Sequence, residues 1–217
     1  HLVIRRQRQM CIRDRYDAWS IVNDKGSTYL IGNSLNGFNS EFDGFTNEDS
    51  DYMNDINSIS YAAYRLIVHR FNNSPGSDRI IGKANSLMNI LGLDINFLES
   101  DGYESNSSSL GNFIAEQYIE YGLLDGSNEQ SDYINQYYDP VNEPLAPIFS
   151  GNPTITDPNR WQPLSLDIFV DQSGNVLSET TPEFLGAEWG SVWPFGLNDE
   201  DLTEFERDGN TYKVYHD

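Results

Sequence analysis

Apolar residues recur every three or four positions in three stretches of the chain, residues 47–72, 77–91 and 110–124. This spacing places the apolar side chains of each stretch on one face, so three amphipathic α-helices are predicted. A shorter stretch, Tyr16–Val22, is typical of the end of a helix, closed by Asp24 and Gly26. The side chains expected to be buried are Ile56, Ile59, Ala63, Leu66 and Ile67; Ile80, Ile81, Ala84, Leu87, Met88 and Leu91; and Leu110, Phe113, Ile114, Tyr118 and Tyr121.

The boundaries between the first two predicted helices carry clear signals. Acidic residues gather at the start of residues 47–72, and Arg65, His69 and Arg70 lie near the end, an arrangement that the helix dipole favours. Pro75 and Gly76 then break the chain, and the hydroxyl of Ser77 is expected to cap the next helix. Two amphipathic helices joined by so short a turn predict an αα-hairpin.

The remaining chain is predicted to form long ordered loops with little strand. Residues 27–45 are rich in Gly and Asn but carry scattered apolar side chains, which indicates a loop packed onto a core. Residues 166–170 and 176–177 flank the turn sequence Asp171–Asn175 and predict a β-hairpin. Residues 211–216 predict a further strand. The expected fold class is therefore mainly α, a helical domain with long ordered loops and a small β-hairpin.

The segment Gly151–Leu164 (GNPTITDPNRWQPL) differs from a surface linker because it holds Arg160 and Trp161 between prolines. Its three prolines fix φ and remove backbone donors, so neither a helix nor a central strand runs through it. We expect a structural clamp, in which Trp161 fills a pocket and Arg160 binds backbone carbonyls left unpaired. The alternative is the wall of a polar active site. The clamp residues predicted from this segment are Asp157, Arg160, Trp161 and Gln162.

Residues 1–15 (HLVIRRQRQMCIRDR) are expected to be non-native. Back-translation of Arg5 to Arg15 gives a nucleotide sequence similar to a transposase adaptor used for sequencing libraries. A basic targeting segment is the alternative, but no apolar region follows it. We therefore treat residues 1–15 as adaptor-derived, expect them to pack against nothing, and expect residues 16–217 to be incomplete at both ends.

The charge of the chain excludes several classes of partner. It has 13 basic and 34 acidic residues, a net charge of −21; without the five arginines and one aspartate of residues 1–15, 8 basic and 33 acidic residues and a charge of −25 remain. So acidic a chain is not expected to bind nucleic acid or an anionic membrane through its overall field. The one cysteine, Cys11, lies in the adaptor-like segment, so no disulfide or thiolate metal site is expected. No apolar run is long enough to predict a membrane span.

Because like charges on one domain repel each other, we predict that the stability of this protein rises with salt. Mobile ions screen charges over roughly 10 Å at 0.1 M ionic strength, which relieves the repulsion among the carboxylates. The measurement is the thermal unfolding midpoint between low and molar KCl. An unchanged midpoint would contradict the prediction.

No sequence motif of catalysis is present. There is no nucleophile elbow, P-loop, dinucleotide fingerprint or HExxH, and no catalytic, cofactor-binding or metal-binding residue is predicted. His69 is interpreted as a partner of the helix dipole, and the pair Glu116 and Glu120 as a solvated helix face. Asp171–Asn175 has only half the pattern of a calcium loop.

Six phrases of the sequence carry a family resemblance: YDAWSIV (16–22), ISYAAYRLIVHRFNNSPG (59–76), LGNFIAEQYIEYGLLDGSNE (110–129), GNPTITDPNRWQPLSLDIFVDQSGN (151–175), EWGSVWPF (188–195) and RDGNTYKVYHD (207–217). In this order they resemble the bacterial vanadium-dependent haloperoxidase-like proteins of the type-2 phosphatidic acid phosphatase superfamily. The resemblance extends over essentially all of residues 16–217 and is closest to a branch from marine Bacteroidetes, whose members are usually exported.

The resemblance implies a parent enzyme that oxidises halide with hydrogen peroxide at a bound vanadate. The family holds vanadate with a Lys-x6-Arg-Pro segment, a Ser-Gly-His segment and an Arg-x5-His segment, and this chain contains none of them; Lys83 and Arg160 lack the spacing. It is therefore expected to be an N-terminal helical region truncated before the catalytic bundle, inactive alone and without vanadate, its partner being that missing region. The alternatives are a fragment of a same-superfamily phosphatase and an extracellular binding module with Trp161, Trp189 and Trp193 as aromatic platforms. A complete calcium-stabilised domain is a further alternative, and it would require a carboxylate cage.

Overall fold

The structure is a computed structural model that describes most of the chain. For residues 2–11, and for residues 177, 191, 199, 207, 210 and 212–215, it describes the backbone only. The described residues are 2–46, 52–147, 151–152, 155–170, 174–178, 181, 183–184, 186–194, 197, 199–207 and 209–215.

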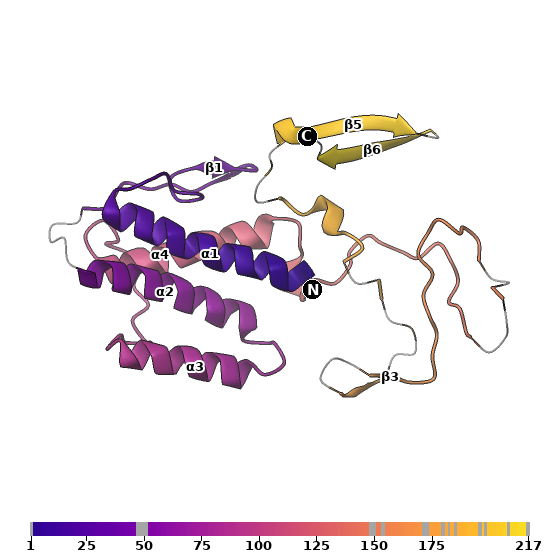
Figure 1. Ribbon diagram of the computed structural model, residues 1–217, viewed down its shortest axis with the longest axis horizontal. Helices are drawn as coiled ribbons and strands as arrows, with labels where there is room; N and C mark the ends of the chain where they lie inside the picture. The colour runs from indigo at the N-terminus through magenta and orange to yellow at the C-terminus, as the bar shows by residue number, and fades with distance from the viewer. Residues whose placement is uncertain are drawn as a thin grey trace. The chain divides into compact units, whose positions relative to one another are not determined.

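The described chain is mainly α-helical, as predicted (Figure 1). Its helices are α1 (Leu2–Asn23), α2 (Tyr52–Phe71), α3 (Ser77–Ile90) and α4 (Ser107–Leu124). None of them is long and apolar enough to cross a membrane. Short 3₁₀ turns lie at η1 (Glu129–Ser131), η2 (Trp189–Ser191) and η3 (Asp199–Asp201).

Among the described residues, the strands form three separate antiparallel pairs. They are β1 (Ser34–Leu35) with β2 (Phe38–Asn39), β3 (Phe169–Val170) with β4 (Val176–Leu177), and β5 (Leu202–Arg207) with β6 (Asn210–Tyr215). The β3–β4 pair confirms the hairpin predicted around residues 171–175, and β6 confirms the predicted last strand. The β1–β2 and β5–β6 pairings were not predicted.

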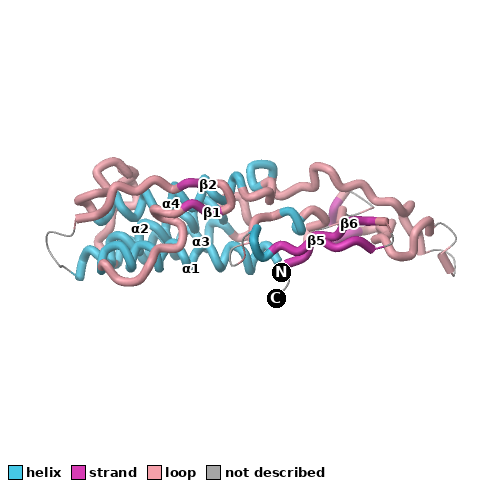
Figure 2. The backbone as a smooth tube through the Cα atoms, turned by 90° about the horizontal axis from the view of Figure 1, so that it is seen from above, coloured by secondary structure: helices cyan, strands magenta, loops and turns pink. Residues whose placement is uncertain are grey.

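The chain divides into two compact units, His1–Leu124 with Trp193–Asp217, and Asp125–Val192. In the first unit, α1, α2 and α4 pack together and α3 lies against α2 (Figure 1). The second unit consists almost entirely of loops (Figure 2). The core of the first unit comprises Ala18, Val22, Leu30, Ile31, Phe38, Ala62, Leu66, Leu110, Ile114, Tyr118 and Tyr121.

Helix α2 buries a different stripe from the predicted one. Ser58, Tyr61, Ala62, Tyr64 and Leu66 are buried, whereas the predicted Ile56, Ile59, Ala63 and Ile67 are only half-buried. The reason is a close approach to Gly111 of α4. A Cβ on Gly111 would lie 2.5 Å from the carbonyl oxygen of Ser58 and 2.7 Å from Cβ of Tyr61. Small residues on both helices therefore let the backbones meet, and this fixes which face of α2 points inward.

We expect Gly111→Ala to destabilise the first unit by about 1–3 kcal/mol or more, because the added methyl group overlaps the backbone of α2. The matched control is Gly82→Ala in α3, where an added Cβ meets nothing within 4 Å. That change should be neutral or stabilising by up to about 1 kcal/mol, since alanine is the better helix former. The measurement is urea unfolding of both variants; equal stability of the two would contradict the close crossing.

Helix α3 also differs from the prediction. It is preceded by Gly76 with φ 77° and no side-chain cap, so Ser77 is the first helical residue and not the cap. Of the predicted apolar face only Met88 is buried, packing with Tyr61 and Tyr64 of α2. Leu87 is 56% exposed. The pattern identified the αα-hairpin correctly, but it overstated how much of α3 is covered.

Residues 24–46 form the predicted loop packed onto the core (Figure 2). Leu30, Ile31 and Phe38 are buried against the helices, and Phe42 stacks on the ring of Tyr103 with centroids 5.5 Å apart. Aromatic packing therefore holds a segment that has little regular structure of its own.

Candidate functional site

The proline-rich segment predicted as a clamp is held by a side chain outside it, Asn142. The Nδ2 group of Asn142 donates to the carbonyl oxygens of Asp157 at 2.8 Å, Arg160 at 3.0 Å and Trp161 at 3.3 Å. Its Oδ1 atom accepts from the backbone N–H groups of Thr156 at 2.8 Å and Asp157 at 2.7 Å. Asn142 is 2% exposed. One buried amide thus pairs five backbone groups of a segment that cannot pair them in a helix or sheet.

Two further contacts fix the same segment to residues 143–145. The N–H of Leu145 donates to the carbonyl oxygen of Pro163 at 2.8 Å, and the N–H of Ser165 donates to that of Leu145 at 3.0 Å. The predicted residue Gln162 donates from Nε2 to the carbonyl oxygen of Glu143 at 2.9 Å and pairs with the side chain of Asn152. Asp157 accepts the N–H of Asn159 on its carboxylate at 2.9 Å. Asp157 and Gln162 therefore have local structural contacts.

Contrary to the prediction, the side chain of Arg160 does not bind backbone carbonyl groups. Its side chain is exposed, and no hydrogen bond or ion pair of its guanidinium is found among the described residues, so the prediction about its role is corrected. The physical reason is that Asn142 already pairs the carbonyl groups for which Arg160 was proposed. Trp161 is half-buried and stacks on the ring of Phe184, with centroids 4.9 Å apart and planes 12° apart.

Glu188 anchors another loop of the second unit. Its carboxylate accepts the backbone N–H groups of Gln136 at 2.9 Å and Tyr138 at 2.7 Å, and that of Tyr137 as well. These bonds, with that from Gln136 foremost, lower the pKa of Glu188 below its usual value. Successive N–H groups make an anion-binding concavity, and here the chain's own carboxylate fills it.

A depression of about 250 Å³ opens beside this loop. It is lined by residues 135–140 together with Glu183 and Phe184. Among the described residues that line it, the charged groups are the carboxylates of Asp139 and Glu183, and none is basic. A negative lining of this kind opposes binding of vanadate or phosphate.

The three tryptophans proposed as aromatic platforms are half-buried. Trp161 is covered by Phe184, and Trp193 packs on Tyr121 with ring centroids 5.5 Å apart. The side chain of Trp189 lies close to Gly186, where an added Cβ would be 3.0 Å from the Trp189 ring. Carbohydrate platforms require exposed ring faces, so this packing counts against a carbohydrate-binding surface on these residues.

Arg65, on α2, uses its hydrogen-bond donors inside the fold. Its guanidinium donates to Oδ1 of Asn112 at 3.0 Å, to the carbonyl oxygen of Ile95 at 3.1 Å and to that of Phe97. It also lies 5.2 Å from the ring centroid of Tyr64. Burial is the main cause that lowers the pKa of Arg65. The side chain ties the loop after α3 to α2 and α4, so its donors are used inside the fold.

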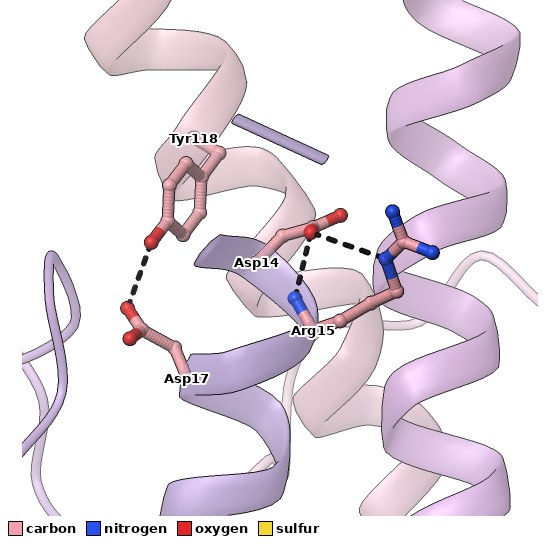
Figure 3. A network of polar contacts seen from close by, with 4 residues as sticks. All are labelled: Asp14, Arg15, Asp17 and Tyr118. Carbon is pink, nitrogen blue, oxygen red and sulfur yellow. Dashed lines mark hydrogen bonds and ion pairs between the residues drawn. The ribbon is translucent and has the colours of Figure 1, made fainter. Parts of the chain in front are cut away.

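Helix α1 carries two buried carboxylates, Asp14 and Asp17 (Figure 3). Asp17 accepts the backbone N–H groups of Tyr29 at 2.6 Å, Leu30 at 2.9 Å and Ile31 at 3.2 Å, and the hydroxyl of Tyr118 at 3.0 Å. Burial raises the pKa of Asp17 although these four donors oppose the shift. Asp17 therefore joins α1, the loop after it and α4. The pattern of apolar residues gave no signal for this polar contact.

Asp14 corrects the expectation that residues 1–15 pack against nothing. Its side chain is fully buried, and the guanidinium of Arg13 lies 3.7 Å from the ring centroid of Tyr29. Because α1 is continuous from Leu2 to Asn23, the residue three positions before Asp17 must share its inward face. Desolvation raises the pKa of Asp14 to about 7, and its Oδ2 atom has no hydrogen-bond partner among the described residues. The side chains of Arg5, Arg6 and Arg8 lie outside the described part of the structure.

Within the described residues, no group of three or more His, Cys, Asp or Glu side chains is arranged to hold a metal ion. Glu116 and Glu120 lie on the exposed face of α4, as predicted, and His69 is exposed near the end of α2. The half calcium pattern at residues 171–175 lies partly outside the described residues, because residues 171–173 are not described.

The arrangement of these residues is structural: buried amides, carboxylates and Arg65 pair backbone groups of loops. Sequence inspection missed Asn142, Asp17 and Glu188, because single polar residues in loops or helices show no periodic signal. Comparison with known proteins finds no matching family model and no matching curated protein.

Proposed function

We propose that this chain is the N-terminal helical region of a vanadium-dependent haloperoxidase-like protein, and that it scaffolds a catalytic region without binding vanadate itself. The six phrases that resemble this family support the assignment. The mainly helical architecture is compatible with it. Three of the phrases contain or adjoin residues that organise the fold, namely Asp17, Gln162 and Glu188.

The observation that carries the scaffold role is that Arg65 spends its hydrogen-bond donors on groups inside the fold and not on a ligand site. An oxyanion cradle needs several cations and donors aimed at one point. Arg65 gives its donors to neutral oxygens of Asn112, Ile95 and Phe97. The depression in the second unit has carboxylates in its lining. These two observations support the proposal that this chain does not bind vanadate or phosphate itself.

Equilibrium dialysis of the 217-residue chain against micromolar vanadate tests the scaffold role. We expect no saturable binding. Saturable micromolar binding would overturn the proposal, and loss of that binding in Arg160→Ala would identify the exposed Arg160 as a ligand. Sequencing of the gene beyond the codon of Asp217 tests the family assignment separately, since the three cradle segments are expected there.

A phosphatase of the same superfamily is the second candidate, because it uses the same cradle for phosphate. The matching sequence region does not distinguish a haloperoxidase from a phosphatase, so the activity of the full-length parent has to distinguish them. Oxidation of bromide by peroxide and vanadate identifies a haloperoxidase, and hydrolysis of a phosphomonoester without peroxide identifies a phosphatase.

A further inference from the structure

Helix α3 packs on α2 and exposes a face that is basic at its start and apolar at its end (Figure 1). Four exposed residues lie in one row along this face: Arg79, Lys83, Leu87 and Ile90. Their spacing of three or four positions places the row on the side of the helix opposite the buried Met88. Leu87 is 56% exposed and Ile90 is 81% exposed. Among the described residues, the side chains of Arg79 and Lys83 make no hydrogen bond or ion pair.

The positive charge of this face does not stabilise the helix that carries it. Residues 56–93 contain four basic residues and one acidic residue, whereas the rest of the chain contains nine basic and 33 acidic residues. Arg79 lies in the first turn of α3, where the helix dipole disfavours a positive charge. Arg79 and Lys83 are also a like-charged pair one turn apart, which destabilises a helix. A partner surface with negative charge offsets both effects.

Helix α4 exposes a row with the opposite charge and the same spacing. Glu116, Glu120 and Leu124 are exposed one turn apart, and Leu124 is 61% exposed. Two carboxylates followed by a leucine on α4 thus correspond, at equal intervals, to two cations followed by a leucine on α3. The charges and the leucines of the two rows match when the helices run parallel. Because these side chains are exposed, the two rows do not cover each other within one chain.

We propose that α3 of one copy of this chain docks in parallel on α4 of a second copy. The two carboxylates of α4 face the two cations of α3, and Leu124 covers Leu87 and Ile90. Exposed ion pairs contribute little free energy, so burial of the apolar side chains supplies most of the association. The charges select the partner surface and the parallel orientation. The interface is independent of the proposed function.

The test is sedimentation equilibrium of the 217-residue chain in 0.15 M KCl, where we expect the apparent mass to rise with protein concentration. Two double variants reverse the charges of one row each: Arg79→Glu with Lys83→Glu on α3, and Glu116→Lys with Glu120→Lys on α4. In each variant alone, like charges face each other across the contact, so association should weaken at least about tenfold. A mixture of the two variants should associate again, because the two reversed rows carry opposite charges. A variant that fails to fold cannot give this recovery.

The matched control is Glu99→Lys with Asp101→Lys, in the exposed loop after α3. It lowers the net negative charge of the chain as much as the α4 variant does, so it should leave association unchanged or strengthen it. A parent chain that stays monomeric would overturn the proposal, as would a mixture that does not recover. Association that is lost in the control, or that persists in both double variants, would also overturn it, because the two rows then do not hold the copies together.

Discussion

Asn142→Ala should destabilise the second unit on the order of 3–5 kcal/mol, a large effect for one polar residue. The change removes all five hydrogen bonds of the amide and leaves buried N–H and carbonyl groups of residues 156–161 unpaired. Each orphaned buried group costs about 1–3 kcal/mol, reduced where water enters. The prolines on either side prevent the segment from pairing these groups by forming regular structure.

Hydrogen exchange gives the sharpest measurement of this effect. The amides of Thr156 and Asp157 donate to Oδ1 of Asn142, so their protection should be lost in Asn142→Ala. Arg160→Ala is the control: its side chain is exposed, and the change should alter stability by less than about 0.5 kcal/mol and leave those amides protected. If these amides lose their protection in Arg160→Ala but keep it in Asn142→Ala, then Arg160, and not Asn142, holds the segment.

The stability of the first unit should fall as pH rises from about 4 to about 7, because of Asp14. Its pKa is about 7 in the folded protein against an ordinary value of 3.8. The folded state therefore holds the proton more tightly than the unfolded state across this interval, so removing the proton favours unfolding. At about 1.4 kcal/mol per pKa unit, the loss is on the order of 4 kcal/mol by pH 8.

Asp14→Asn is the matched variant, since it keeps an oxygen to accept the N–H of Arg15 but does not ionise. The difference in unfolding free energy between the variant and the parent chain should be small at pH 4 and large at pH 8. The comparison removes the contribution of other carboxylates, including Asp17, whose pKa is also raised by burial. A difference that is independent of pH would show that burial does not raise the pKa of Asp14, even though its Oδ1 atom lies 3.8 Å from Nε of Arg15.

Asp14 is also poorly suited to its buried position, and the adaptor origin of residues 1–15 stays a prediction. A helix that continues through position 14 buries whatever residue stands there, and a carboxylate with an orphaned oxygen is a poor occupant. Deleting or replacing a native buried residue is usually destabilising, whereas replacing Asp14 is expected to stabilise the chain at neutral pH.

Periodicity predicted the positions of α2, α3 and α4, and in α4 it also predicted most of the buried face. Leu110, Ile114, Tyr118 and Tyr121 are all fully buried in α4, as their spacing indicates. The same rule missed the inward face of α2, since the decisive feature is Gly111 on another helix. Apolar spacing alone does not reveal where two backbones approach closely.

The loops were less predictable from sequence, because single polar contacts between distant residues hold them. The prolines of residues 151–164 correctly indicate an irregular segment, but nothing in that segment indicates Asn142 as its partner. In the same way, the loop at 136–138 is fixed by Glu188, fifty residues or more away. Such contacts depend on how the chain returns on itself, which local pattern does not specify.

The central claim is that this chain scaffolds a haloperoxidase-like catalytic region and has no vanadate site of its own. The most direct test compares bromide oxidation, with peroxide and vanadate, by the full-length parent and by the 217-residue chain. We predict activity in the parent and none in the chain. A parent that hydrolyses a phosphomonoester but does not oxidise bromide, or a chain that oxidises bromide alone, would contradict the account.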